Sequence, residues 1–132
     1  MKGTILLKEM ESQLKIGVEQ KERIDPQAIF FDIEIGMDIT DAAMSQNIEE
    51  TVNYNAVQRV IEQFLENKDY ILLEKVASDV AVLLLKEFPR IEEITLTCWK
   101  PQALQKKNVK NVGIKISKKR NNELVQTIES DE

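Results

Sequence analysis

The chain contains no histidine among its 132 residues. This absence excludes histidine-based general acid–base catalysis, Ser-His nucleophile pairs and histidine-ligated zinc. There is one cysteine, Cys98, so neither an internal disulfide nor a four-cysteine metal site can form. An enzyme made from this chain therefore works with Lys, Tyr, Glu and Asp side chains, and we expect it to need no metal or other cofactor.

Long apolar runs are also missing, because no stretch approaches the roughly 20 residues that a membrane helix needs. The N-terminal "MKGTILLKEMES" becomes charged too soon to be a signal peptide. Together with the single cysteine, this favours a cytoplasmic protein without membrane contact. The net charge of -5 gives the whole molecule no bias toward nucleic acid.

The first third of the chain reads as a hairpin. Residues 4–8 and 12–18 have an extended pattern, and the "EMES" between them predicts a bend or a bulge. A polar loop, 19–27, contains the turn signal Asp25-Pro26. Strict alternation over 28–39 then predicts a second strand, antiparallel to the first.

The rest of the chain alternates between helical and extended patterns. A polar connector, 40–51, precedes a helix that begins near Tyr54 and runs to about residue 67, capped by Thr51 or Asn53. A second helix is predicted from about 72 to 88. Two more strands are predicted over 91–100 and 112–117.

The order β-β-α-α-β-β predicts an α+β domain, in which a four-stranded antiparallel sheet is covered by two helices on one face. The other face would carry Asp32, Glu34, Thr95 and Thr97. We expect residues 1–120 to form one domain and residues 121–132 to form a flexible tail. Assembly into a ring would protect the two sheet edges.

Four residues stand out as candidates for chemistry: Lys100 before a proline, Glu74 at a helix start, Tyr54 at the other helix start, and Glu22 in a loop. Each has an ordinary structural explanation when taken alone. Lysines are usually on the surface, glutamates favour first helical turns, and tyrosines often lie at the rim of a core.

Taken together, these residues lie in motifs that resemble the dihydroneopterin aldolase family of the tunnelling fold. The resemblance extends from about residue 4 to 118 and rests on the order and spacing of its parts. The parts are "IGV" with the loop residue Glu22, "FFDIEIGMD" (30–38), "TVNYNAV" (51–57), "LLEKVASDVAVLLL" (72–85), "KP" (100–101) and "VGIKI" (112–116).

The resemblance implies a pterin site. Glu74 would anchor the pterin by accepting two parallel hydrogen bonds, and backbone groups near Leu73 and Val52 would complete that edge. Tyr54 would come from a neighbouring subunit, in tetrameric rings that stack as an octamer. The implied partners are thus a small pterin and further copies of the chain.

The resemblance also implies the reaction. Retro-aldol cleavage of 7,8-dihydroneopterin gives 6-hydroxymethyl-7,8-dihydropterin and glycolaldehyde, with Lys100 as the main acid–base group. Tyr54 would take part in proton transfer, and Glu22 would lie near the hydroxylated tail. No Schiff base is needed, because the substrate's own C=N bond accepts the electrons.

Two alternatives stay open at this point. The first alternative is a dihydroneopterin triphosphate epimerase. It stays open because Gln102 stands where many of these aldolases have glycine, and because the loop before Glu22 has no aromatic residue. The other is a non-catalytic module that binds a pterin or purine. The lysines between 100 and 120 favour an edge strand that is protected by charge against pairing with other chains. The second interpretation is that they attract a phosphorylated pterin.

Overall fold

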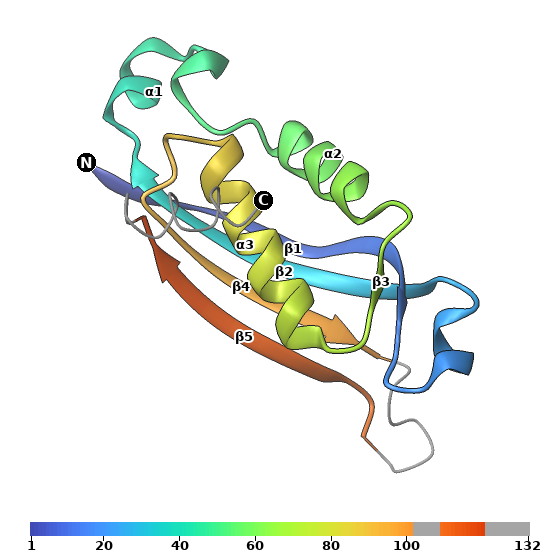
Figure 1. Ribbon diagram of the computed structural model, residues 1–132. Coiled ribbons are helices and arrows are strands. Elements are labelled where there is room, and N and C mark those ends of the chain that lie inside the picture. Colours follow the sequence, from blue (N-terminus) through green and yellow to red (C-terminus); the bar gives the residue numbers. More distant parts are fainter. Residues whose placement is uncertain (102–108, 121–132) are drawn as a thin grey trace.

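A computed structural model describes residues 1–101 and 109–120, and Figure 1 shows its arrangement. The predictions for Gln102 and for the tail 121–132 lie outside these ranges. A sheet forms one layer, and two longer helices cover one of its faces (Figure 1). No helix in the described part of the chain is long and apolar enough to span a bilayer.

The predicted hairpin is confirmed. Strand β1, Lys2–Ile16, pairs antiparallel with β2, Gln27–Asp38. The register shifts between Leu7 and Met10, where Glu9 adopts a φ of 54°. The irregularity predicted at "EMES" is therefore a β-bulge at Lys8 and Glu9. It places Ile5 and Leu7 on the same face as Met10, Leu14 and Ile16 despite the change from odd to even positions.

Strand β4, Glu93–Lys100, pairs with β2, and β5, Val112–Lys119, pairs with β4. Both pairings are antiparallel, as predicted. A fifth strand, β3 at Asp69–Tyr70, was not predicted and lies parallel to the end of β1. The sheet order is β3-β1-β2-β4-β5, so the prediction of four strands was one too few.

Helix α2, Tyr54–Leu65, begins at Asn53, whose side chain accepts a hydrogen bond from the amide of Asn55. Helix α3 spans Leu73–Glu87, one residue inside the predicted bounds at each end. The connector 40–51 is more ordered than predicted. It contains the short helix α1, Thr40–Ser45, and a 3-10 turn η2, Ile48–Glu50.

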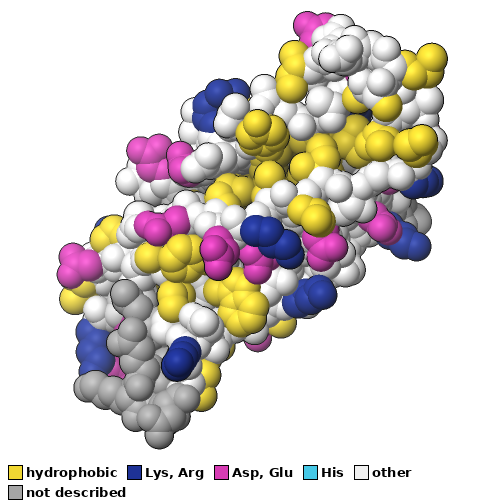
Figure 2. Space-filling model, turned by 180° about the vertical axis from the view of Figure 1, so that it is seen from behind, with side chains coloured by type: hydrophobic (Ala, Val, Ile, Leu, Met, Phe, Trp, Pro, Cys, Tyr) yellow, Lys and Arg dark blue, Asp and Glu magenta, His cyan; other side chains and the backbone are white. Residues whose placement is uncertain are grey.

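The core lies between the sheet and these two helices. It is made of buried hydrophobic side chains from the sheet and the helices, among them Ile29, Phe31, Ile33, Ile35, Ile61, Val76, Val80, Leu84, Ile94 and Leu96. The opposite face of the sheet mixes charged and hydrophobic side chains (Figure 2). The predicted polar residues are there, with Asp32 opposite Thr97 and Glu34 opposite Thr95.

Candidate active site

A pocket of about 250 Å³ lies where the end of β4 meets the start of α3 and the end of β1. Its polar lining consists of Glu22, Glu74 and Lys100. Ile16, Val18, Ile71, Leu72 and Leu73 form the apolar lining. The structure thus brings together four predicted site residues, Lys100, Glu22, Glu74 and Leu73, from three separate parts of the sequence.

Lys100 is buried because of its place in the strand. The alternation of β4 puts Ile94, Leu96 and Cys98 toward the helices, and Lys100 continues that face at the strand end. Only 8% of Lys100 is exposed, which is unusual for a lysine unless it is paired. Its Nζ lies 3.3 Å from Oε2 of Glu22. An ammonium group has three protons to donate, and this is its one hydrogen bond within the described residues.

Glu22 lies on the 3-10 turn η1, Gln20–Arg23, that follows β1. Its Oε1 accepts a hydrogen bond of 3.1 Å from the backbone N–H of Glu19. This bond and the nearby Lys100 ammonium lower the pKa of the Glu22 carboxyl, whereas partial burial opposes the shift. Glu22 is therefore ionised at neutral pH and presents a carboxylate to Lys100.

Glu74 occupies the first turn of α3, where the helix dipole favours a negative charge. The side chain is exposed and makes no hydrogen bond or ion pair with the described residues. Strand β3 holds this helix start beside the end of β1, since Ile16 pairs with Tyr70 and Gly17 N–H donates to Tyr70 O. The carboxylate of Glu74 is thus free to accept hydrogen bonds from a ligand.

The structure does not bring Tyr54 and Val52 to this pocket. Val52 is buried in the core, and Tyr54 is 59% exposed at the beginning of α2. Neither residue lines the pocket. Helix α2 begins on the side of α1 and ends near β3 (Figure 1). Within one copy of the chain, the pocket lacks both residues.

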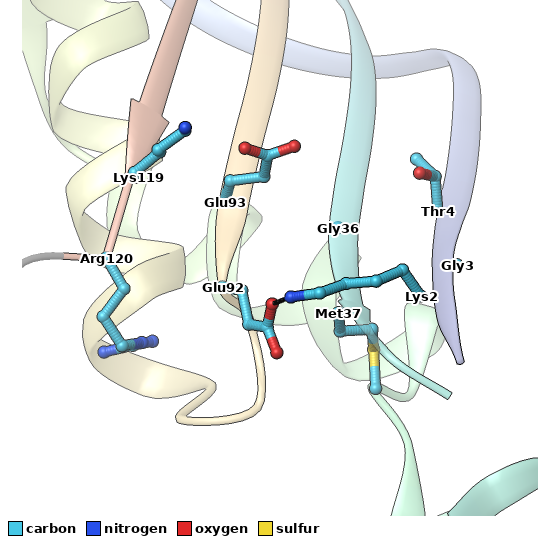
Figure 3. Close-up of a pocket in the computed structure, with 9 residues that line it drawn as sticks. All are labelled: Lys2, Gly3, Thr4, Gly36, Met37, Glu92, Glu93, Lys119 and Arg120. Atoms are coloured by element: carbon cyan, nitrogen blue, oxygen red, sulfur yellow. Dashed lines mark hydrogen bonds and ion pairs between the residues drawn. The ribbon is translucent and has the colours of Figure 1, made fainter. Parts of the chain in front are cut away.

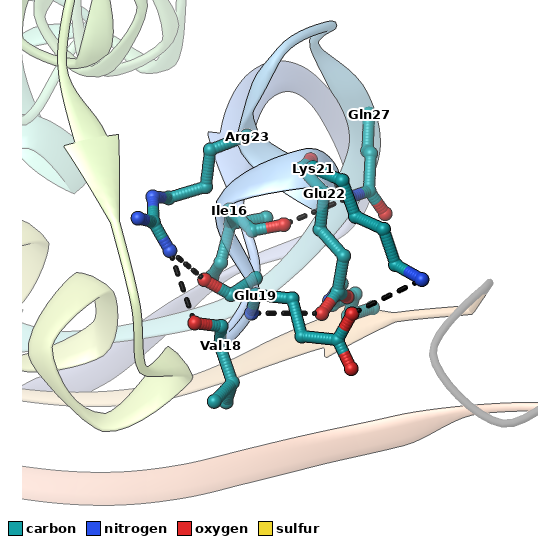
Figure 4. A network of polar contacts seen from close by, with 9 residues as sticks. Ile16, Val18, Glu19, Lys21, Glu22, Arg23 and Gln27 are labelled. Carbon is teal, nitrogen blue, oxygen red and sulfur yellow. Dashed lines mark hydrogen bonds and ion pairs between the residues drawn. The ribbon is translucent and has the colours of Figure 1, made fainter.

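Sequence reasoning missed Arg23 and Gln27, whose side chains bind backbone carbonyls beside the pocket (Figure 4). It also missed the role of Gly17, where an added Cβ would lie 2.2 Å from Cβ of Glu22. The one available signal was a glycine five positions before the candidate loop residue Glu22.

Two other cavities among the described residues contain no buried lysine. One of about 460 Å³ lies at the far end of the sheet, lined by Lys2, Glu92 and Lys119 among others (Figure 3). Lys2 and Glu92 form an ion pair there. A cavity of about 490 Å³ on the uncovered sheet face has Phe30 and Trp99 in its lining. No three or more Cys, Asp or Glu side chains in the described ranges are arranged to hold a metal ion.

The chain is similar to known proteins along most of its length. The profile of the dihydroneopterin aldolase family matches residues 5–117. A dihydroneopterin aldolase of Haemophilus influenzae is 30% identical over 112 residues, which cover 85% of this chain and 92% of the relative. One from Streptococcus pyogenes serotype M1 is 30% identical over 104 residues, covering 79% and 87%.

A solved structure, that of E. coli dihydroneopterin aldolase in complex with neopterin, superposes with a TM-score of 0.82 at 28% identity. The superposition covers 88% of this chain and 98% of that one. The likeness confirms the tunnelling fold that the sequence predicted.

Proposed function

The chain belongs to the dihydroneopterin aldolase family, and we propose that it cleaves 7,8-dihydroneopterin at the pocket between β4 and α3. The observation that carries the proposal is the buried Lys100, ion-paired with Glu22 and facing the same pocket as the free carboxylate of Glu74. In a family of aldolases, this arrangement supplies both a binding group and an acid–base pair.

Glu74 anchors the pterin ring. Its two oxygens accept parallel hydrogen bonds from a ring N–H and the exocyclic amino group, as carboxylates do with planar donor pairs. Leu73 lies beside it at the first position of α3, where backbone N–H groups have no partner within the helix. Apolar side chains of Ile16, Leu72 and Leu73 cover the faces of the bound ring.

Lys100 carries the proton transfers. A base removes the proton from the side-chain hydroxyl, the adjacent C–C bond breaks, and the substrate's C=N bond takes up the electron pair. Glycolaldehyde leaves, and an acid then delivers a proton to the carbon that was cut, giving 6-hydroxymethyl-7,8-dihydropterin. Glu22 lies 3.3 Å from Lys100 Nζ and borders the space for the hydroxylated tail. Readdition of glycolaldehyde to the opposite face gives epimerisation as a second outcome of the same steps.

A neighbouring copy completes the site with Tyr54 and Val52, in rings of four that stack as an octamer. Exposed apolar side chains at the pocket support this assembly. They are Val18, Ile71 and Leu72, which border the pocket and are 70%, 55% and 50% exposed. Two sheet edges support it too. In the described residues, β1 pairs with β3 only at Lys15 and Ile16, and β5 pairs only with β4. A closed ring would pair such edges.

Sedimentation velocity tests this assembly directly. We expect a single species of several subunits at micromolar concentration. A stable monomer that still cleaves the substrate would contradict a site shared between copies.

The reaction is tested by incubating the protein with 7,8-dihydroneopterin and, separately, with its triphosphate, and separating the products by chromatography. Release of glycolaldehyde from the first supports the aldolase. Inversion of the triphosphate without cleavage supports the epimerase instead. Pterin binding without turnover of either substrate would leave only the non-catalytic binding module.

Two substitutions separate binding from chemistry. Lys100→Met should lower turnover by roughly 10²–10⁴-fold, the usual contribution of a general acid–base group, with pterin affinity kept. Glu74→Gln should weaken pterin binding by about tenfold or more, because one charge-assisted hydrogen bond contributes about 1.5–3 kcal/mol. Full activity of Lys100→Met would refute the assignment of Lys100.

A further inference from the structure

The loop between β1 and β2 places the Glu22 carboxylate, and two side chains outside the pocket hold that loop. Arg23 and Gln27 both turn toward the loop backbone (Figure 4). Neither belongs to the residues that line the pocket. Both are partly buried, although arginine and glutamine in a surface loop would ordinarily extend into water.

Arg23 folds back over its own turn. Its Nη1 donates to the carbonyl of Gly17 at 2.7 Å and to that of Val18 at 3.2 Å. One nitrogen of a planar guanidinium thus joins two successive carbonyls. These carbonyls lie directly before the turn that carries Glu22, so Arg23 fixes the direction in which the chain enters the turn.

Gln27 fixes the exit of the same turn. Its Nε2 donates to the carbonyl of Ile16 at 2.8 Å and to that of Glu22 at 3.2 Å. Ile16 is the last residue of β1, and Gln27 is the first residue of β2. The amide therefore ties the backbone of Glu22 itself to the rigid end of the hairpin.

The side chain of Glu22 packs closely against Gly17. An added Cβ at Gly17 would lie 2.2 Å from Glu22 Cβ and 2.8 Å from its Oε2, so the glycine permits this close approach. The amide of Gly17 also donates to Tyr70 O at 3.1 Å. Hydrogen bonds therefore connect the turn that carries Glu22 to the hairpin and to β3.

From this geometry we propose that Arg23 and Gln27 are positioning residues, which hold the 17–22 turn so that the Glu22 carboxylate faces Lys100 and the substrate's tail. The inference rests on the proposed function for the role of Glu22. Misplacing a reacting group by about 1 Å can lower a rate by about 10²-fold, so loss of either side chain acts on turnover rather than on binding of the pterin ring.

The experiment compares Arg23→Met and Gln27→Met, which keep side-chain length but remove the donors. Arg23→Lys keeps the charge and tests whether the guanidinium geometry matters. Arg59→Met and Gln58→Met, at exposed positions of α2, are the matched controls. Thermal melts verify that each variant is folded.

We expect kcat for 7,8-dihydroneopterin to fall about tenfold to a hundredfold in the Arg23 and Gln27 variants, including Arg23→Lys. The dissociation constant of 6-hydroxymethyl-7,8-dihydropterin, which lacks the extended tail, should change less than twofold. The controls should match the unmodified protein in both.

A second readout does not depend on turnover. The carboxyl of Glu22 is followed by carbon NMR as the pH is lowered. Its pKa lies below the ordinary value mainly because the N–H of Glu19 donates to it, with Lys100 and Lys21 adding smaller effects. Loosening the turn removes the Glu19 donor, so the pKa of Glu22 should rise in Arg23→Met and Gln27→Met.

The outcomes separate the two proposals. If the unmodified protein cleaves the substrate while the Arg23 and Gln27 variants keep its kcat and the pKa of Glu22, the positioning role is wrong and the aldolase stands. If the unmodified protein does not cleave 7,8-dihydroneopterin, the proposed function fails. The pKa of Glu22 in the variants then still decides whether the two side chains hold the turn.

Discussion

Lys100 is buried because of its position in the alternation of β4. Every second residue of β4 faces the helix layer, and Lys100 falls on that series at the point where α3 begins. Pro101 follows directly and cannot donate a further hydrogen bond to the sheet, so the strand stops there. Moving the lysine by one position would place it on the other face, where Trp99 lies.

At the same scale, Gly17 is predicted to be intolerant of a methyl group. In Gly17→Ala the new Cβ would meet Cβ of Glu22, which cannot move without the backbone of the turn. We expect turnover to fall about tenfold to a hundredfold and unfolding to become easier by about 1–3 kcal/mol, as for other overpacked sites. Steady-state kinetics and urea unfolding measure the two effects.

Gly36→Ala is the control for that substitution. Its Cβ would approach Cγ of Glu93 at 2.9 Å, but Glu93 is an exposed side chain that can swing aside. Equal losses in Gly17→Ala and Gly36→Ala would show that glycine replacement itself, and not the position of Glu22, is responsible.

The residues of the site were predictable only to the extent that their own chemistry marks them. Lys100, Glu22 and Glu74 are ionisable residues at the ends of elements, and the family resemblance placed them. Arg23 and Gln27 were not predicted because their side chains donate to backbone carbonyls. A sequence pattern does not indicate which backbone groups a side chain contacts. That Tyr54 lies away from the pocket of its own copy depends on the tertiary path of α2.

At the scale of elements, the end of α3 is held by a residue from another strand. Arg120, next to the end of β5, donates through Nη2 to the carbonyls of Leu85 and Phe88 at 2.6 and 3.0 Å. Its Nε donates to Ile91 O at 2.7 Å. These carbonyls lie at or after the helix C-terminus, where a positive charge is favourable and backbone groups have no helical partner.

Arg120→Met should therefore destabilise the protein by about 1–3 kcal/mol, the cost of leaving partly buried acceptors unpaired. Lys119→Met, at the exposed neighbouring position, should change stability by less than about 0.5 kcal/mol. Urea unfolding followed by circular dichroism measures both. The interpretation is wrong if the two substitutions have the same effect.

Elements with long, regular periodicity were predictable, and short ones were not. The alternation in β2 and the apolar stripes of α2 and α3 extend over 12 or more residues each. Strand β3 has two residues, too few to show any period, and its partner is β1, more than 50 positions earlier in the sequence. Helix α1 is six residues long with none of them buried, so no apolar stripe marks it.

For the whole molecule, two buried groups limit stability at high pH. Burial raises the pKa of the Cys98 thiol from 9.0 to about 12. Burial, with the hydrogen bond from Tyr70 to Asp79, also raises the pKa of the tyrosine hydroxyl above 10.0. Since both folded-state values lie above the unfolded ones, the stabilisation is present below about pH 9 and is lost as the pH rises.

Unfolding free energy should accordingly fall above about pH 9, by up to about 1.4 kcal/mol per pH unit for each group. The slope should be smaller in Cys98→Ala and in Tyr70→Phe, whatever the absolute stability of those variants. Urea unfolding between about pH 8 and about pH 11 measures it. An unchanged slope in both variants would contradict the assignment.

The bulge in β1 changes which residues of the strand face the core. Side chains alternate between the two faces of the sheet on both sides of Glu9, but odd-numbered residues face the core before it and even-numbered residues face the core after it. Deleting Glu9 would restore a continuous alternation and keep Ile5 and Leu7 facing the core, whereas closing the bulge without a deletion would turn Lys2, Thr4 and Lys8 toward the core. Removing a single residue between 3 and 7 would instead turn every residue before it to the opposite face of the sheet, so single-residue deletions are expected to be tolerated at the bulge and not in the segment before it.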